Sequence, residues 1–394
     1  MRGKPDDLFT LESALGAAGP DVVAQIRKVR HITFHSGGDT GASTDTKGKY
    51  RNEITVADQM TDDCRSNDPK TRPRFFYHLG DVVYNFCEPE YWYDQFYEPY
   101  RNYPAPIFAI AGNHDSFITH GTPAASYPLV TFSRNFCAEK PNITAEARSL
   151  HRTAMTQPGV YFALDAPFVR ILGFFSNSLE DPGVISNQSK KWPAVPNHQL
   201  EFLEAQLQRI KTENYKGAVL LAVHHPPFTY SPKKEGKSAG GNHGPSTEML
   251  HEIDQICDKV GIYPHAFLSG HAHNYQRFAR AINFKGKEYE VPFVVCGDAG
   301  HNVNPIVHNA HGQQVPEPHF GTDVRYLDVK PAIDSKDLKL KKYADNRTSY
   351  GYLRITVSAT QIAIGFHLVG VSSLAQSRFD LVTVDLESHR VVAN

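Results

Sequence analysis

The chain has 394 residues, of which 40% are hydrophobic and 21% charged, and its formal net charge is −1. This composition is typical of a globular protein with a sizeable core, and the near-zero charge argues against binding of nucleic acid or anionic membranes through bulk charge. The five cysteines are scattered and odd in number, so they indicate neither a disulfide framework nor a Cys-x-x-Cys zinc site. Twenty histidines are the unusual feature, and many stand beside glycine or proline, which hints at metal or proton chemistry.

The start of the chain, residues 1–7, is polar and lacks the apolar run of a signal peptide. No stretch of the sequence is apolar for long enough to span a bilayer. We therefore expect a cytoplasmic protein as the sequence stands, and a periplasmic or secreted one if a leader has been removed. Asn142, Asn187 and Asn346 begin Asn-x-Ser/Thr sites, which matter only if the chain is secreted by a eukaryote.

The first third of the chain predicts a helical lead-in over residues 1–28 and then three short apolar strands. Leucine, valine and isoleucine recur at loose helical spacing through the lead-in. Each strand is followed by glycine and a polar residue, in the three segments Gly38-Asp39-Thr40-Gly41, Gly80-Asp81-Val82-Val83-Tyr84 and Gly112-Asn113-His114-Asp115. Polar residues at the carboxyl ends of strands are where open α/β sheets keep their chemistry.

The middle of the chain begins with a long Pro/Ser/Thr-rich insert at about 116–159, which we expect to be a lid or a surface excursion. Two adjacent antiparallel strands are expected at 160–164 and 169–175. Two helices are expected next, one after Asn197 and one between Ser246 and Gly261, with Asn197 and Ser246 as N-caps and Gly261 as the C-terminal stop.

Two more strands end in histidines. An apolar strand at 217–223 leads into His224-His225-Pro226-Pro227, and a short strand at 267–269 leads into Gly270-His271-Ala272-His273. The remainder predicts strands at 291–296, 352–357, 361–368 and 379–386. Alternating βα units followed by strands fit one elaborated, layered α/β domain over residues 29–394, closed by an antiparallel sheet.

Seven residues that directly follow strands form a candidate metal-binding set: Asp39, Asp81, Asn113, His114, His224, His271 and His273. Hard oxygen and imidazole donors without cysteine suit Zn, Mn or Fe. Seven donors exceed the needs of one ion, whereas two ions sharing a carboxylate need such a set and can clamp both oxygens of a phosphoryl transfer. Each motif alone is weak, since Gly297-Asp298-Ala299-Gly300 shows that a similar string arises by other routes.

The ordered blocks around these residues resemble the calcineurin-like metallophosphoesterase superfamily, and more narrowly the purple acid phosphatases. Most of the superfamily carries a histidine two residues after the first aspartate, where this chain has Gly41. The purple branch instead supplies a tyrosine, found here as Tyr84. The resemblance covers roughly residues 30–385, apart from the insert and the stretch 301–350. It implies a four-layer αββα sandwich of two packed mixed β-sheets flanked by helices, an α/β fold with a dinuclear metal site at the carboxyl ends of the strands.

The resemblance also implies a role for each residue of the site. Asp39, Tyr84 and His273 would bind the first ion, Asn113, His224 and His271 the second, and Asp81 would bridge them. His224 is preferred because the family pattern is His-x-Pro, which Pro226 completes, and His225 is the alternative because residue 227 is also proline. His114 would contact the phosphate, and His243, in His243-Gly244-Pro245-Ser246, is similar to the family's second phosphate-contacting histidine. Asp115 would orient His114 or a ligand.

The implied reaction is metal-dependent hydrolysis of small-molecule phosphate monoesters through attack of a metal-bridging hydroxide, with Fe³⁺ plus Fe²⁺, Zn²⁺ or Mn²⁺ as cofactors. A phosphodiesterase or nucleotidase on the same site is the alternative, and the insert and the loop 231–242 would line the mouth. Lys233, Lys234 and Lys237 in that loop are more simply explained as exposed lysines of a solvated loop. A non-catalytic scaffold on this fold is the remote alternative. The sequence leaves the oligomeric state and the physiological substrate open.

Overall fold

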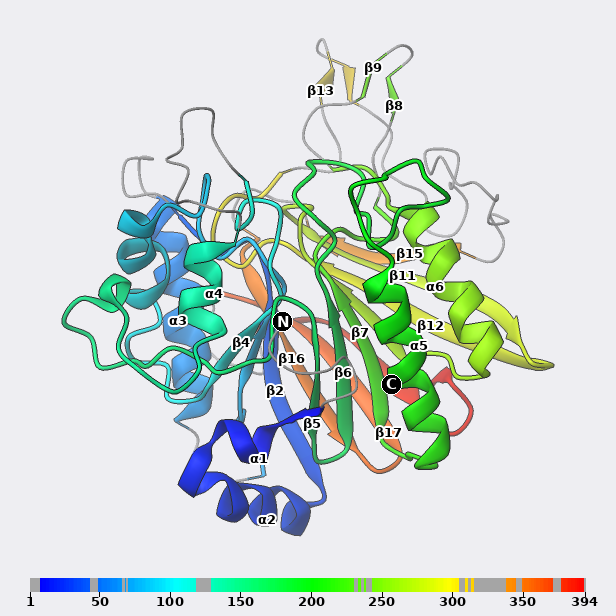
Figure 1. Cartoon of the computed structure of the whole chain (residues 1–394), viewed down its shortest axis with the longest axis horizontal. Coiled ribbons are helices and arrows are strands. Elements are labelled where there is room, and N and C mark those ends of the chain that lie inside the picture. The colour runs from blue at the N-terminus through cyan, green and yellow to red at the C-terminus, as the bar shows by residue number, and fades with distance from the viewer. Residues whose placement is uncertain are drawn as a thin grey trace.

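Two β-sheets lie at the centre of the computed structural model, and helices flank them on either side (Figure 1). The structure describes residues 8–42, 49–65, 68, 70–117, 129–229, 233–234, 237–238, 243–304, 309–310, 313–314, 338–344, 349–370 and 377–392. Both sheets contain parallel and antiparallel neighbours. This is the four-layer sandwich of two mixed sheets that the sequence predicts.

The larger sheet has eight strands. In spatial order they are β1 (Leu8–Thr10), β5 (Phe162–Ala166), β6 (Val169–Phe174), β7 (Ala218–Val223), β10 (Ala266–Ser269), β12 (Lys287–Cys296), β11 (Tyr275–Phe284) and β15 (Leu338–Ala344). The pairs β6–β7, β7–β10 and β10–β12 are parallel, so their carboxyl ends share one edge. The predicted antiparallel pair of β5 and β6 is confirmed.

The smaller sheet has seven strands. In spatial order they are β19 (Arg390–Val392), β18 (Arg378–Asp385), β17 (Gln361–Leu368), β16 (Gly351–Ser358), β2 (His31–Gly37), β3 (Phe76–His78) and β4 (Ile107–Ala109). The three strands β2, β3 and β4 run parallel, so the three predicted glycine-polar turns leave the sheet at the same edge. The two short pairs β8–β9 (Lys233–Lys234 and Lys237–Ser238) and β13–β14 (Asn309–Ala310 and Gln313–Gln314) lie outside both sheets.

The helices are α1 (Leu11–Ala14), α2 (Gly19–Val29), α3 (Lys49–Cys64), α4 (Val130–Phe136), α5 (His198–Thr212) and α6 (Thr247–Val260). Three hydrophobic cores lie between the layers. One core lies between the sheets, a second joins the larger sheet to α5 and α6, and a third joins the smaller sheet to α3, α4 and the aromatic segment 92–103. Burial of apolar side chains from both faces of each sheet therefore holds the four layers together.

Several local predictions need correction. Leu8 lies in β1, which pairs with β5, rather than in the helical lead-in. Strand β11 was not predicted, although it forms a long hairpin with β12. Asn197 and Ser246 do occupy the N-cap positions of α5 and α6, but neither side chain caps its helix. Their oxygens accept instead from Asn187 N and Gly183 N, because tertiary contacts compete for them.

Candidate metal centre

The turns that follow β2, β3, β4, β7 and β10 bring the predicted donors together. Hydrogen bonds between neighbouring turns fix this arrangement: Asp39 N donates to Gly80 O over 2.9 Å, and Gly270 N donates to His224 O over 3.0 Å. The side chains of Asp39, Asp81, Asn113, His224 and His271 are at most 1% exposed. Five segments far apart in the sequence thus deliver polar groups to one buried place.

The first half of the site is formed by Asp39, Tyr84 and His273. The Tyr84 hydroxyl lies 3.1 Å from Asp39 Oδ1 and 3.1 Å from His273 Nε2. His273 Nε2 lies 3.4 Å from Asp39 Oδ1. The Tyr84 hydroxyl also lies 2.9 Å from Asp81 Oδ2, which connects this half to the next.

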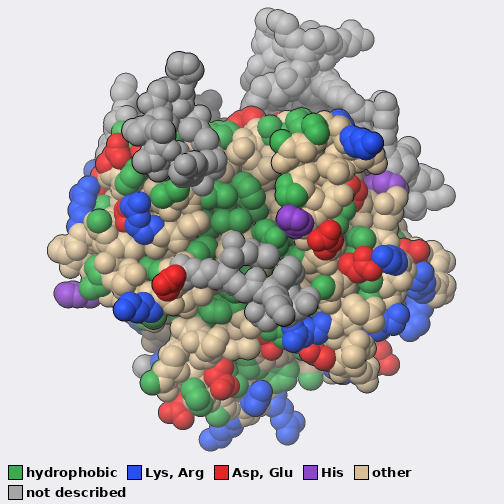
Figure 2. All heavy atoms as spheres, in the orientation of Figure 1, with side chains coloured by type: hydrophobic (Ala, Val, Ile, Leu, Met, Phe, Trp, Pro, Cys, Tyr) green, Lys and Arg blue, Asp and Glu red, His purple; other side chains and the backbone are tan. Residues whose placement is uncertain are grey.

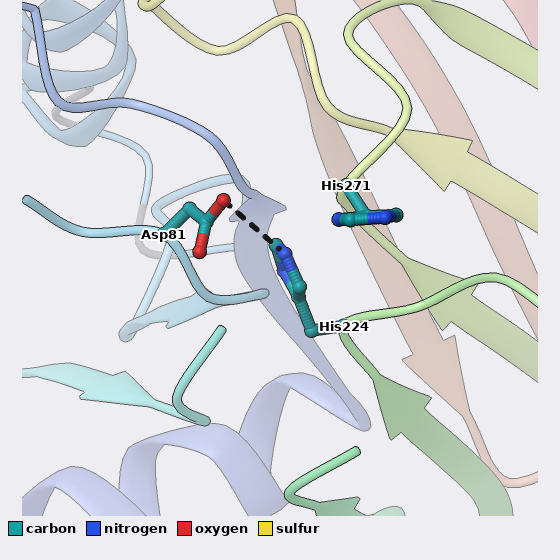
Figure 3. A group of neighbouring side chains, drawn as sticks. All are labelled: Asp81, His224 and His271. Carbon is teal, nitrogen blue, oxygen red and sulfur yellow. Dashed lines mark ion pairs between the residues drawn. The ribbon is translucent and has the colours of Figure 1, made fainter. Parts of the chain in front are cut away.

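The second half is formed by Asn113, His224 and His271. Asn113 Oδ1 lies 3.0 Å from His224 Nε2 and 3.0 Å from His271 Nδ1. His224 Nε2 lies 3.3 Å from Asp81 Oδ2, the ion pair drawn in Figure 3, where His271 lies on the other side of His224. One oxygen atom of Asp81 therefore approaches both halves, as a bridging carboxylate must.

The donor atoms fit two cations. Ligand atoms bonded to one ion at about 2.1 Å lie about 3 Å apart, which is the spacing found in each half. The two buried carboxylates, Asp39 and Asp81, pair with histidines rather than with Lys or Arg in the described part of the chain, so they also call for positive charge. Asp81, His224 and His271 each place one ligand atom within 4.8 Å of the others, close enough to hold one ion.

The electrostatics of the cluster agree with this fit. Burial and the neighbouring Asp39 and Asp81 raise the pKa of the Tyr84 hydroxyl well above its usual value, so a phenolate there needs a bound cation. Burial opposes charge on His224, but Asp81 outweighs it and raises the pKa of His224 to about 9. The same pairing lowers the pKa of Asp81 despite its burial. A bound cation would replace these protons.

Three residues of the site have a left-handed backbone conformation. Asp39, Asp81 and His271 have φ values of 57°, 54° and 67°, a left-handed conformation that side chains with a Cβ rarely adopt. Gly112 permits the close approach of Asp81, because a Cβ on this glycine would lie 2.1 Å from Asp81 Oδ1. Strain of this kind persists where the surrounding structure enforces it, and it gathers at functional sites.

His114 lies at the mouth of the site and is only partly buried. Its backbone N donates to Asp81 Oδ1 over 2.9 Å, and its Nδ1 lies 2.7 Å from Asn85 O. Asp115, expected to orient His114 or a ligand, accepts from the backbone N of Gly112, Val82 and Val83, beside the proposed ligand Asp81. Asp115 thus fixes the turn that carries Asp81.

His243 joins the second half from the loop before α6. Its ring centroid lies 3.9 Å from that of His271 and 5.8 Å from that of His273. His225, by contrast, is committed to the neighbouring loop: Ser176 Oγ lies 2.7 Å from its Nδ1, and Leu179 O lies 2.8 Å from its Nε2. Both ring nitrogens of His225 are therefore used, which favours His224 as the ligand.

Sequence reasoning missed three residues at the site. His301 stacks on Tyr84 with a centroid distance of 3.7 Å and an interplanar angle of 11°, and its Nδ1 donates to Gly41 O over 2.6 Å. The only signal for His301 in the sequence is the glycine-polar segment 297–300 before it, which follows the end of β12. Glu180 and Asp181, in the loop between β6 and α5, also reach the second half, and no pattern in the sequence marks them.

The comparisons with known proteins agree with the fold. A family model described as calcineurin-like phosphoesterase matches residues 38–275. The structure is similar to one titled "GAP50 the anchor in the inner membrane complex of Plasmodium", with a TM-score of 0.52 and 11% identity over 89% of this chain and 87% of that chain.

It is also similar to a solved structure titled "Structure of PhoD", with a TM-score of 0.51 and 13% identity over 93% of this chain and 72% of that chain. At these identities the likeness shows the fold alone. No curated protein matches the sequence. The family match includes the turns that carry Asp39, Asp81, Asn113, His224, His271 and His273. The chain therefore belongs to the calcineurin-like phosphoesterase family.

Proposed function

We propose that the protein is a purple acid phosphatase-like phosphomonoesterase with two metal ions, a ferric ion in the first half and Fe²⁺, Zn²⁺ or Mn²⁺ in the second. The observation that carries this proposal is the position of Asp81 Oδ2, 2.9 Å from the Tyr84 hydroxyl and 3.3 Å from His224 Nε2. It supports a carboxylate shared by two ions. Family membership supports hydrolysis of phosphoric esters.

Each residue has a distinct task in this proposal. Asp39, Tyr84 and His273 would hold the first ion, Asn113, His224 and His271 the second, and Asp81 both. Bound ions would supply the nucleophile by acidifying water and would neutralise charge on the phosphoryl oxygens. Asp115 keeps the Asp81 turn in place through three backbone N–H groups.

The two remaining histidines would handle the substrate. His114 and His243 lie on opposite halves of the site, against Tyr84 and His271 respectively. His114 is tied to Asn85 O through Nδ1, which leaves Nε2 as the nitrogen for a phosphoryl oxygen or for proton transfer to the leaving alkoxide. His243 would stabilise a second phosphoryl oxygen.

The test of the metal assignment is elemental analysis and an absorption spectrum of protein purified without chelator. We expect two metal equivalents and a visible tyrosinate-to-iron band that disappears in Tyr84→Phe, while the variant still binds metal through its remaining donors. Iron bound at the site of a colourless wild-type protein would refute the assignment to the purple branch. Fewer than two equivalents would refute the dinuclear site.

A phosphodiesterase remains the second candidate because of one observation. Glu180 and Asp181 lie 3.6 Å and 3.7 Å from His243 Nδ1, where their negative charge would oppose a phosphate ester. A diester carries one negative charge, whereas a monoester carries nearly two at neutral pH because its second pKa is about 6. Comparison of kcat/KM for matched aryl monoesters and diesters decides between the two. Metal binding with no hydrolysis of either ester would instead support a non-catalytic scaffold.

A further inference from the structure

Two adjacent carboxylates reach the second half of the metal centre from the loop between β6 and α5. Asn113 Nδ2 donates to Glu180 Oε2 over 3.3 Å. Asp181 Oδ1 lies 3.6 Å from His271 Nε2, and Asp181 Oδ2 lies 3.7 Å from His243 Nδ1. The pair therefore contacts two proposed ligands of the second ion and the proposed phosphate-binding histidine.

His271 gives an independent reason to assign this pair a role. Its Nδ1 faces Asn113 Oδ1, so its Nε2 is the nitrogen turned away from the second ion. This Nε2 is buried without a hydrogen-bond partner, and Asp181 is the carboxylate that approaches it. Histidines that bind metals almost always donate their other N–H to a carboxylate, carbonyl or water, which fixes the ring and makes it a better ligand.

The loop that carries the pair is anchored on both sides. His225 Nε2 donates to Leu179 O over 2.8 Å, immediately before Glu180. Gly183 N donates to Ser246 Oγ over 2.8 Å, shortly after Asp181. His225 directly follows the proposed ligand His224, so its bond to Leu179 connects the loop to the turn that carries this ligand. These bonds fix the backbone of the loop. The side chain of Asp181 is 39% exposed and can adjust its position.

The ligands proposed for the second half carry less negative charge than those of the first, and Glu180 and Asp181 add negative charge beside the second half. Asp39 and a Tyr84 phenolate would bring negative charge to the first half. Asn113, His224 and His271 are neutral when they bind a cation, so Asp81 is the only anionic ligand proposed for the second half. Carboxylates placed just behind neutral ligands strengthen the binding of a divalent ion.

We propose that Glu180 and Asp181 are positioning residues that orient Asn113 and His271 toward the second ion and hold His243 beside them. The inference rests on the proposed function, because it concerns the same dinuclear site. It predicts that loss of the pair weakens one ion selectively and leaves the other in place. A general defect of folding would weaken both.

Asp181→Asn tests this prediction. Metal-free wild-type and variant protein are titrated with Zn²⁺ in competition with a chromophoric chelator, which measures the affinities of the two equivalents separately. We expect the variant to bind one equivalent about 10- to 100-fold more weakly and the other with unchanged affinity. Asp94→Asn is the matched control, because Asp94 is similarly exposed, at 36%, and pairs with Arg148 instead of the site. It should bind both equivalents as wild type does.

Other outcomes overturn the inference. Unchanged affinities in Asp181→Asn, or equal losses in both equivalents, would refute a positioning role. Loss of a third equivalent would show that Asp181, His243 and His271, which lie close enough to hold an ion, bind a metal directly. If Asp181→Asn does not fold, Glu180→Gln decides, with the same selective loss expected through Asn113. A wild-type protein that binds fewer than two ions would instead refute the proposed function on which the inference rests.

Discussion

Tyr84 is held in the first half of the metal centre by contacts to its backbone and to its ring. Tyr84 N donates to Gln95 Oε1 over 2.8 Å, and Gln95 Nε2 donates to Tyr84 O over 2.8 Å. His301 stacks on the ring, and the ring of His114 lies 4.3 Å away. The tyrosine therefore has a position fixed by neighbours that are not ligands themselves.

Gly41 occupies a position with no room for a side chain. A Cβ at this position would lie 2.5 Å from Gln95 Oε1 and 2.6 Å from Val82 O, closer than side chains ever approach. The position that carries a histidine in most of the resembled superfamily is thus closed in this chain. The same Gln95 that closes it also holds Tyr84.

We predict that Gln95→Leu displaces Tyr84. The substitution keeps the size of the side chain but leaves two buried backbone groups unpaired, at a cost of about 1–3 kcal/mol each. In iron-loaded protein the visible band should shift or weaken, because the phenol oxygen no longer has a fixed position. Absorption spectra and denaturant unfolding measure the two effects.

The chain offers a matched control for this prediction. Gln199, in α5, makes the same two bonds to the backbone of Phe175, over 2.9 Å and 2.7 Å. Both residues are far from Tyr84 in the sequence. Gln199→Leu should lower the free energy of unfolding by a similar amount and leave the band unchanged. A normal band in Gln95→Leu would show that the two bonds from Gln95 do not position Tyr84.

Residues at strand ends were predictable, and residues in loops were not. Asp39, Asp81, Asn113, His224 and His271 follow apolar strands, and parallel strands must end at one edge, so the sequence indicates their convergence. Glu180 and Asp181 lie in a loop whose path depends on bonds to His225 and Ser246, far away in the sequence. His301 likewise depends on the turn after β12, a strand of the other sheet. Such placements come from tertiary contacts that no local pattern encodes.

At the scale of elements, part of the insert at 116–159 belongs to the outer core. Residues 118–128 lie outside the described residues, so the predicted lid has no structural test there. In α4, however, Phe132 and Phe136 are fully or almost fully buried. The Phe136 ring centroid lies 5.3 Å from that of Phe96 and 5.9 Å from that of Trp92, both in the aromatic segment 92–103. This part of the insert is neither lid nor decoration.

Phe136→Ala tests the structural role of α4. Truncation of a buried phenylalanine leaves a cavity and typically costs about 3–5 kcal/mol in the free energy of unfolding. Ile143→Ala in the same insert is the control, since Ile143 is 48% exposed and should lose less than about 1 kcal/mol. Urea unfolding compares the two variants. Similar small losses in both would mean that α4 contributes little to the core.

At the scale of the whole molecule, no helix in the described part of the chain is both long and apolar enough to cross a membrane. The face shown in Figure 2 carries acidic and basic side chains interspersed, in keeping with the net charge of −1. The histidines divide into two groups. Some lie at the candidate metal centre, whereas His265 and His367 are buried elsewhere in the fold and His389 is half-buried there.

Burial keeps this second group uncharged. It lowers the pKa of His265 to about 4, of His367 to about 4 and of His389 to about 3. In the unfolded chain the pKa of a histidine is about 6.5. Between that value and the folded pKa the unfolded state binds protons that the folded state does not, so these residues make stability fall as the pH decreases through this window. Function at acidic pH would therefore depend on other sources of stability.

His265→Gln isolates this effect. His265 accepts from Val219 N over 2.9 Å and donates to Leu386 O over 3.1 Å, and glutamine can make such bonds without titrating. One histidine of this kind costs about 2 kcal/mol of stability between pH 7 and pH 5. The variant should lose correspondingly less stability than wild type over this range in urea unfolding, whereas the exposed His151→Gln should behave as wild type does. Parallel pH profiles for His265→Gln and wild type would mean that His265 is protonated in the folded protein as readily as in the unfolded chain.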